Sequence, residues 1–225
     1  MKLSGLNEEV LRLKFRNHVY LPATRAHRRR QLRVDDFTII SNNCWGGTVY
    51  ESYGIKKLSP TVGMFIMPED YLKLVADLPG YLAQPLTFID PEQSRWRDAL
   101  RGRKNWGTYP VARLGDIELH MLHYRDPETA RRKWESRVAR VNPARLIFKF
   151  NDQNGATAEH IRRFMNLPLA HRLCFVSKPE LRAVPGTVFV RQPARYADGV
   201  MASREPLGRS RAMDVTAYIN SLAER

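Results

Sequence analysis

Short apolar runs rich in β-branched and aromatic residues alternate along most of this chain with segments that are apolar on one helical face. Strands separated by single helices are typical of an α/β protein whose sheet is largely parallel. We expect strands at 37–40, 62–66, 86–89, 109–111, 117–122, 146–150, 173–176 and 188–190, and helices at 48–53, 69–78, 127–141, 157–164 and 214–222. The sequence therefore predicts a three-layer α/β sandwich with a largely parallel sheet.

Three of these helices have distinct start signals. Asp126 is placed to cap a helix that has Pro127 as its first residue, and Thr157 and Asp214 are capping residues for two further helices. A side-chain oxygen at such a position accepts a hydrogen bond from a backbone N–H of the first turn, which would otherwise have no partner. We therefore expect these three helix starts to be well defined.

The chain has 225 residues, of which 43% are hydrophobic, which is enough for one main domain with peripheral additions. We expect a basic amphipathic segment at 1–34, an α/β catalytic-type domain at 35–190, and a mobile loop with a C-terminal helix packed on the same domain at 191–225. A charged stretch with two tryptophans, at 90–108, indicates a long surface excursion or lid.

The N-terminal segment combines an apolar pattern with many Arg and Lys residues. Val10, Leu13 and Val19 suggest an amphipathic helix, and we expect an interruption near Leu21 and Pro22. Such a helix can pack its apolar stripe on the domain, or it can lie on an acidic membrane surface. The sequence leaves both alternatives open.

A formal net charge of +14 favours an anionic partner such as a phosphorylated substrate, acidic lipid or nucleic acid. No recognised nucleic-acid motif is present, so nucleic acid is the least favoured of these partners. No run approaches the roughly 18–20 apolar residues needed to span a bilayer, and the first residues lack the apolar core of a signal peptide. We expect a cytoplasmic protein, with reduced cysteines, that can also bind peripherally to the inner face of the plasma membrane.

The strand expected at 37–40 leads directly into Ser41-Asn-Asn-Cys-Trp-Gly-Gly47. Ligands of α/β sheets bind beyond the carboxyl ends of the strands, and glycine allows backbone to approach a ligand closely. The stretch is neither a P-loop nor a dinucleotide fingerprint, because the required Lys and third glycine are missing. We expect substrate contacts from Asn42, Asn43, Trp45 and Gly46.

Two more polar clusters are expected to line the same cleft. Ser59 and Thr61 form a hydroxyl-bearing turn one βα step after the first loop. Asp116 and His123 flank the strand expected at 117–122, and either could act as a general base. Further substrate contacts are expected from Tyr124 and from two arginines that could stabilise a leaving phosphate, Arg137 and Arg140.

A nucleophilic role for Cys44, with His120 or His123 as base, is an alternative with no local sequence signature. We predict no metal site, because nothing in the chain reads as the Asp-x-Asp motif that holds a divalent cation under a nucleotide-sugar. Asp116 and Glu118 have a similar spacing, but they belong to an expected strand.

Taken together, these stretches resemble a bacterial family from capsule and exopolysaccharide gene clusters, catalogued as domain of unknown function 1919. The matching stretches run in the family's order across about residues 36–177: 37–47, 59–65 with 70–71, 109–111, 116–118 with 123–124, and 130–140. The resemblance implies an α/β protein linked to cell-surface polysaccharide assembly, with a glycosyltransferase-like role. It implies no particular mechanism.

We therefore expect a glycosyltransferase that transfers a sugar from a nucleotide-activated donor during surface polysaccharide or lipopolysaccharide biosynthesis. Its partners would be the nucleotide-sugar donor, a glycan or lipid-linked acceptor, and an acidic inner-membrane surface, with no further cofactor. One alternative is an acyl- or phosphotransferase that modifies a surface glycan. Another is a non-enzymatic basic module that binds nucleic acid or an acidic membrane.

Overall fold

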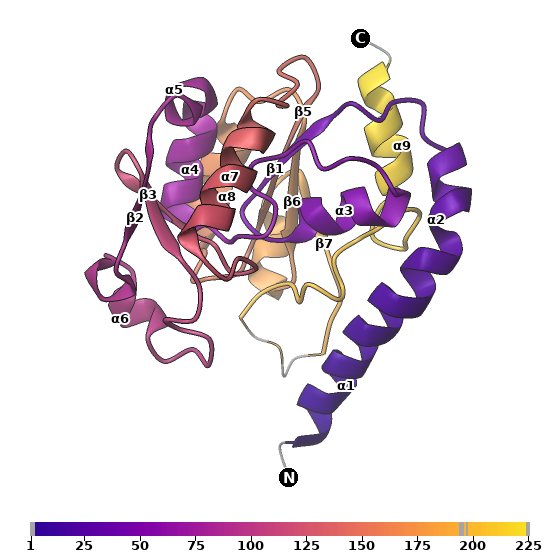
Figure 1. The fold of residues 1–225 in the computed structure, drawn as a ribbon. Helices are drawn as coiled ribbons and strands as arrows, with labels where there is room; N and C mark the ends of the chain where they lie inside the picture. The colour runs from indigo at the N-terminus through magenta and orange to yellow at the C-terminus, as the bar shows by residue number, and fades with distance from the viewer. Residues whose placement is uncertain (1–2, 194–195, 197, 224–225) are drawn as a thin grey trace.

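The computed structural model describes residues 3–193, 196 and 198–223, with side chains described from residue 8 onward (Figure 1). It is a mixed α/β structure with two separate sheets. The first sheet has four strands, all parallel, in the order β1-β5-β6-β7. These strands are β1 (Thr38–Ser41), β5 (Leu146–Asn151), β6 (Arg172–Val176) and β7 (Thr187–Phe189). The α/β class and these four strand positions are confirmed, within one or two residues.

The second sheet is antiparallel, which corrects the expectation of a largely parallel arrangement for residues 86–122. It consists of β2 (Leu86–Ile89), β3 (Val111–Leu114) and β4 (Ile117–His120). Only two residues join β3 to β4, and Gly115 has a φ of +61°. A two-residue connection with a positive φ makes a hairpin, because a parallel crossover needs a dozen or more residues.

Residues 62–66 do not form the expected strand. Phe65 makes a single antiparallel bridge to His120, with N···O distances of 3.0 Å in both directions. The N–H of Ile66 donates to the carbonyl of Asn42 at 2.9 Å. The segment thus connects the end of β1 to the end of β4 instead of joining either sheet as a full strand.

The helices follow most of the expected pattern. Asp126 accepts from the N–H of Thr129 at 2.7 Å, and Asp214 accepts from the N–H of Ala217 at 2.9 Å, so these two caps are confirmed. Thr157 also caps its helix. The helices beyond the N-terminal segment are α3 (Trp45–Tyr53), α4 (Pro68–Ala76), α5 (Leu78–Leu82), α6 (Arg97–Leu100), α7 (Pro127–Val138), α8 (Ala158–Asn166) and α9 (Val215–Asn220), with 3₁₀ turns at Pro91–Gln93, Pro179–Ala183 and Ser221–Ala223. The expected helix at 69–78 divides into α4 and α5, and α3 begins three residues earlier than expected.

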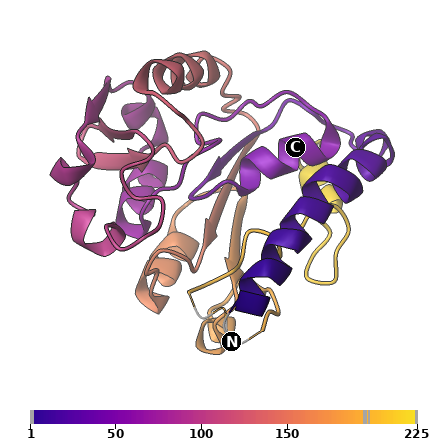
Figure 2. The ribbon, with the colours of Figure 1, turned by 60° about the horizontal axis from the view of Figure 1, so that its bottom comes forward.

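The N-terminal segment is one long rod rather than two helices broken at Pro22. It runs from α1 (Leu3–Phe15) through a π-helical turn, η1 (Arg16–Tyr20), into α2 (Leu21–Arg30). Proline has no N–H and its ring crowds the carbonyl four residues earlier. The wider π-turn lies where that crowding would occur, so the helix continues with altered hydrogen bonding instead of stopping. The rod crosses one side of the molecule (Figure 2).

The parallel sheet separates two apolar cores. Phe148 and Phe150 face a core that includes α4 and α8. Ile147 and Phe175 face the other core, which includes residues of α2, α3 and α9. Parallel strands buried on both faces read as continuous apolar runs, and this explains why the sequence identified them.

The stretch at 90–108, expected to be a surface excursion or lid, packs on the antiparallel sheet. Ser94 Oγ donates to Glu118 Oε2 at 2.5 Å, and the Trp96 indole donates to Asp70 Oδ2 at 2.6 Å. Leu100 is fully buried. None of the described helices is long and apolar enough to cross a membrane.

Candidate functional site

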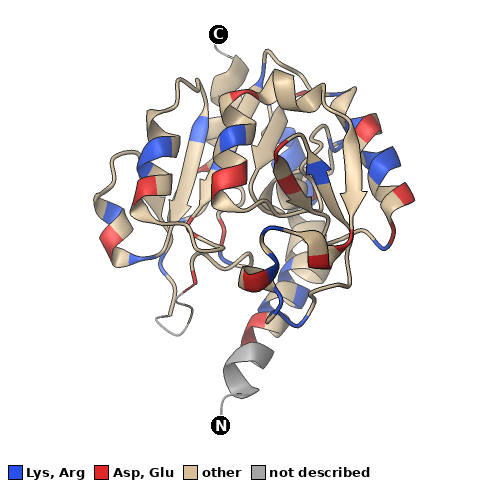
Figure 3. Ribbon diagram, turned by 90° about the vertical axis from the view of Figure 1, so that its left-hand side faces the viewer, with Lys and Arg blue, Asp and Glu red and all other residues tan. Residues whose placement is uncertain are grey.

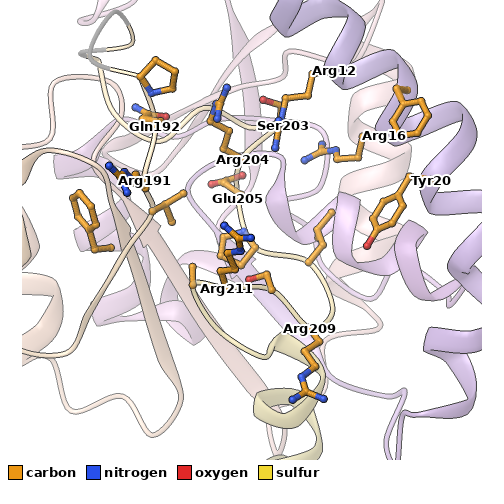
Figure 4. Close-up of a pocket in the computed structure, with 18 residues that line it drawn as sticks. Arg12, Arg16, Tyr20, Arg191, Gln192, Ser203, Arg204, Glu205, Arg209 and Arg211 are labelled. Carbon is orange, nitrogen blue, oxygen red and sulfur yellow. The ribbon is translucent and has the colours of Figure 1, made fainter.

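A cavity of about 1110 Å³ opens beyond the carboxyl end of β7, between the N-terminal rod and the segment 203–212 (Figure 4). Its walls come from three parts of the chain that are far apart in sequence: residues 12–20, 189–193 and 203–212. The carboxyl edge of a parallel sheet is where α/β proteins bind their ligands. We call this the arginine cavity, because six arginines line it: Arg12, Arg16, Arg191, Arg204, Arg209 and Arg211.

Positive charge dominates the arginine cavity. Glu205 is its single acidic residue among the described lining side chains. Arg16 donates to the carbonyl of Ala202 at 2.5 Å, which ties the rod to the opposite wall. Burial lowers the pKa of Arg16, and the nearby carboxylate of Glu205 opposes that shift. Such a site attracts an anion with several oxygen acceptors, because guanidinium groups match phosphate and carboxylate geometry.

Glu205 forms the floor of the cavity and joins it to the parallel sheet. Its Oε1 accepts from Asn43 Nδ2 at 2.9 Å and from Asn151 Nδ2 at 3.1 Å, and it also forms an ion pair with Lys149. Lys149 Nζ donates in addition to Asn43 Oδ1 at 2.8 Å. Asn43 follows β1, whereas Lys149 and Asn151 belong to β5. The ends of two neighbouring strands therefore hold one oxygen of this carboxylate.

The ion pair of Lys149 and Glu205 is buried on both sides. Burial lowers the pKa of Lys149, while the charge and hydrogen bond of Glu205 raise it. Every hydrogen bond that Glu205 makes to the described residues goes to Oε1. Glu205 thus has one oxygen fixed by three donors, whereas Oε2 accepts none of these hydrogen bonds, and the residue lines the cavity.

The predicted loop at 42–47 lies directly beneath the arginine cavity. Asn42 is fully buried, and its Nδ2 donates to Asn151 Oδ1 at 2.9 Å. The Trp45 indole donates to the carbonyl of Pro206 at 2.8 Å, which fixes the segment that carries Glu205. Asn42, Asn43 and Trp45 therefore support the cavity floor, and their direct contact with a substrate stays a prediction.

Close packing explains why residue 46 is a glycine. A Cβ at this position would lie 3.1 Å from Cγ2 of Ile39, on the strand against which α3 packs. A Cβ on Gly47 would likewise lie 3.0 Å from Cγ1 of Val62. The two glycines allow close approach of a helix to a strand and a loop, and a contact of Gly46 with a substrate stays a prediction.

Ser59 and Thr61 are buried and hold their own loop on β1. The hydroxyls of Ser59 and Thr61 lie 3.0 Å apart, and Thr61 Oγ1 accepts from the N–H of Ser41 at 3.1 Å. Both hydroxyls have partners within the protein, and neither residue lines the arginine cavity.

Tyr124, Arg137 and Arg140 brace the same loop from the other side. The carbonyl of Val62 accepts from the Tyr124 hydroxyl at 2.7 Å and from Arg137 Nη1 at 2.9 Å. Arg140 Nη1 donates to the carbonyl of Lys57 at 3.3 Å. Both arginines bind backbone carbonyls and neither lines the arginine cavity, so their role at a leaving phosphate stays a prediction.

Asp116 and His123 lie at opposite ends of β4, and neither lines the cavity. Asp116 Oδ1 accepts from the Tyr81 hydroxyl at 2.6 Å, and its other oxygen pairs with Lys73 at 2.5 Å. These bonds, led by that to Lys73, lower the pKa of Asp116. A four-residue strand spans about 10 Å. The two residues therefore do not meet at one reacting atom.

The thiol alternative has an unfavourable environment. Cys44 Sγ donates to the carbonyl of Met64 at 3.7 Å, and burial raises the pKa of Cys44 to about 12. Because the thiolate is the nucleophile, a thiol with so high a pKa is a poor one. His120 stacks on Phe65 with 4.6 Å between ring centroids, and burial lowers its pKa to about 3. His123 is exposed, and partial desolvation lowers its pKa.

Sequence reasoning missed the residues that define this site: Lys149, Asn151, Glu205 and the six cavity arginines. One signal was present, because Lys149 interrupts the apolar strand at 146–150. A charge in a strand buried on both faces needs a partner. Among the described residues, no group of three or more His, Cys, Asp or Glu side chains is placed to hold a metal ion.

Residues 16–195 match the family described as Domain of unknown function (DUF1919). The chain belongs to this family. An "Uncharacterized protein" of Haemophilus influenzae (strain ATCC 51907 / DSM 11121 / KW20 / Rd) is 32% identical to it over 151 residues. That similarity covers 67% of this chain and 66% of the relative, so the chain spans slightly less than two thirds of the relative's length. The DUF1919 match includes Asn43, Lys149 and Asn151, and it ends before Glu205.

Proposed function

We propose that this DUF1919 protein is a glycosyltransferase that uses a nucleotide-activated sugar during surface polysaccharide or lipopolysaccharide biosynthesis. The observation that supports this proposal best is a single carboxylate, anchored by one oxygen, at the floor of a cavity with six arginines. A nucleotide-sugar carries a diphosphate, which is a polyanion that arginines bind through bidentate hydrogen bonds. A transfer reaction also needs a base near that diphosphate, and Glu205 is the carboxylate in position.

The architecture supports the same proposal. We describe the parallel sheet and the helices over its two faces as a three-layer α/β/α unit, in which the carboxyl edge stays open beside β7. Loops at this edge carry ligand sites in α/β proteins. Asn43 and Asn151 hold Glu205 from the strand ends below.

In the proposed reaction, Glu205 Oε2 takes the proton of the acceptor hydroxyl. The acceptor oxygen then forms a bond to the anomeric carbon of the sugar as the bond from that carbon to the phosphate oxygen breaks. The leaving nucleoside diphosphate keeps the electron pair, and the cavity arginines stabilise its added charge. The fixed Oε1 keeps the base in place, since its three donors come from strand-end side chains.

Calorimetric titration with a panel of nucleotide-sugars tests donor binding. Arg191→Ala with Arg211→Ala removes two exposed guanidinium groups from the cavity, and we expect at least about a tenfold loss of affinity. Arg132→Ala, an exposed arginine of α7, is the matched control and should bind like the wild type. If the wild type binds no nucleotide-sugar, the proposal is wrong.

Two further variants identify the base. Glu205→Gln keeps the shape of the side chain, so we expect it to bind donor and to lose transfer to the acceptor. His123→Ala tests the base predicted from the sequence, and we expect its transfer rate to be unchanged. Loss of transfer in His123→Ala with full activity in Glu205→Gln would reverse the assignment. Circular dichroism checks that Glu205→Gln is folded, because it leaves Lys149 without its counter-charge.

A further inference from the structure

The exposed large apolar side chains gather on one short stretch of the N-terminal rod. Within the part of the chain that the structure describes, the five such residues are Val10, Leu11, Phe15, Val19 and Tyr20. Their exposed fractions lie between 45% and 65%. Soluble surfaces normally carry such residues singly, and a group of them marks an interaction site.

Three of these residues form a stripe along the rod. Leu11, Phe15 and Val19 are spaced four apart, so they follow one another on one helical face. The rod contacts the domain through other positions, since Leu21 is buried in the core shared with α3 and Glu9 is buried beside Arg204. These contacts leave Leu11, Phe15 and Val19 exposed on the rod, which crosses one side of the molecule (Figure 2).

The same part of the rod is strongly basic. Residues 10–30 contain seven Lys and Arg residues and no Asp or Glu. On the side of the molecule that carries the antiparallel sheet, by contrast, basic and acidic residues are interspersed (Figure 3). A helix with an exposed apolar stripe between basic side chains is typical of helices that lie in the interface of an anionic bilayer.

The stripe also adjoins the arginine cavity. Phe15 and Tyr20 are among the exposed apolar residues and also line the cavity, as do Arg12 and Arg16. A flat anionic surface in contact with the stripe would therefore meet the rim of the cavity as well.

We propose that residues 10–20 form a docking surface for an anionic lipid bilayer, with Leu11, Phe15 and Val19 inserted among the headgroups and the neighbouring basic side chains on the lipid phosphates. The mouth of the arginine cavity then faces the membrane. A second copy of the chain is a poorer occupant, because two such faces would oppose one basic segment to another with no acidic residue at 10–30. The docking surface does not depend on the sugar transfer proposed above.

Sedimentation with vesicles tests the docking surface on the full chain. We expect binding to vesicles of phosphatidylcholine and phosphatidylglycerol in equal parts, weak binding to pure phosphatidylcholine, and weaker binding as salt increases. Leu11→Ser with Val19→Ser should reduce affinity for the anionic vesicles by at least about tenfold. Neither residue lines the cavity, so calorimetric binding of nucleotide-sugar should be unchanged if the sugar transfer proposal is right.

The control removes charge from elsewhere on the surface. The control variant is Lys133→Ser with Arg162→Ser, and both residues are exposed. They belong to α7 and α8, two helices whose buried side chains pack in the core on the other face of the parallel sheet. This variant should bind anionic vesicles nearly as the wild type does. Equal vesicle affinity of the wild type and the Leu11→Ser/Val19→Ser variant would overturn the proposal. So would a lipid-free dimer, seen by analytical ultracentrifugation, that the same two substitutions dissociate.

Discussion

His120 is a buried ring whose protonation should control stability in mild acid. It has no solvent exposure, and it lies between Phe65 and Tyr109, with ring centroids at 4.6 and 6.1 Å. Neither ring nitrogen has a hydrogen-bond partner among the described residues. Burial, with a smaller contribution from the charge of Arg103, lowers its pKa from an ordinary 6.5 to about 3.

The direction of the effect follows from these two values. Between about pH 6.5 and pH 3 the unfolded chain binds a proton at His120 that the folded chain does not, so stability falls as the pH falls. For one such group, the expected loss in the free energy of unfolding between pH 7 and pH 5 is about 2 kcal/mol. Substitution His120→Leu removes the titrating ring and keeps an apolar side chain of similar size.

Urea denaturation of both proteins between pH 7 and pH 5 gives the measurement. We expect the wild type to lose about 2 kcal/mol more than His120→Leu over this range, with equal m-values. Other histidines titrate in both proteins, so the difference between the two curves isolates His120. At pH 7 the variant should be as stable as the wild type or more so, because it buries no unpaired ring nitrogen. Parallel pH curves would refute the buried, neutral state of His120.

Two further substitutions test the floor of the site and its support. Lys149→Met leaves Glu205 buried without its counter-charge and should lower the free energy of unfolding, measured by urea denaturation, by about 3–5 kcal/mol. Adding Glu205→Leu should recover most of that loss. If the losses of the two substitutions add up instead, the pairing is contradicted. Gly46→Ala should lower the free energy of unfolding, measured by thermal unfolding, by about 1–3 kcal/mol, because the added Cβ would lie 3.1 Å from Cγ2 of Ile39. Gly102→Ala, whose Cβ would meet nothing within 4 Å, is the matched control, and equal losses in the two would contradict close helix–strand packing.

Local sequence patterns predicted the secondary structure where the stabilising interactions involve residues close together in the sequence or an apolar run within one strand. The caps at Asp126, Thr157 and Asp214 depend on side chains that bond within one helical turn. The apolar strands β1, β5 and β6 were found because both faces of the parallel sheet are buried. The antiparallel hairpin of β3 and β4 also has a local cause, because Gly115 and Asp116 form its two-residue turn.

The candidate site was predicted only in part. The loop at 42–47 was correctly placed at the carboxyl edge of β1, where Asn43 reaches the floor of the cavity. Asp116 and His123 flank one expected strand, so the sequence already placed them at its opposite ends. Only the structure shows that neither of them lines the arginine cavity.

The sequence by itself determined the α/β class, the main strands and helix starts, the strong positive charge and the polar exit from β1. These features follow from local hydrogen bonding and from the apolar pattern of buried strands. Only the tertiary structure decided that Glu205, 56 residues after Lys149, completes its ion pair, and that the N-terminal rod closes one wall of the arginine cavity. The reason is that the burial of these charges, which costs free energy, and the charge pairing that offsets that cost both arise only after distant segments meet.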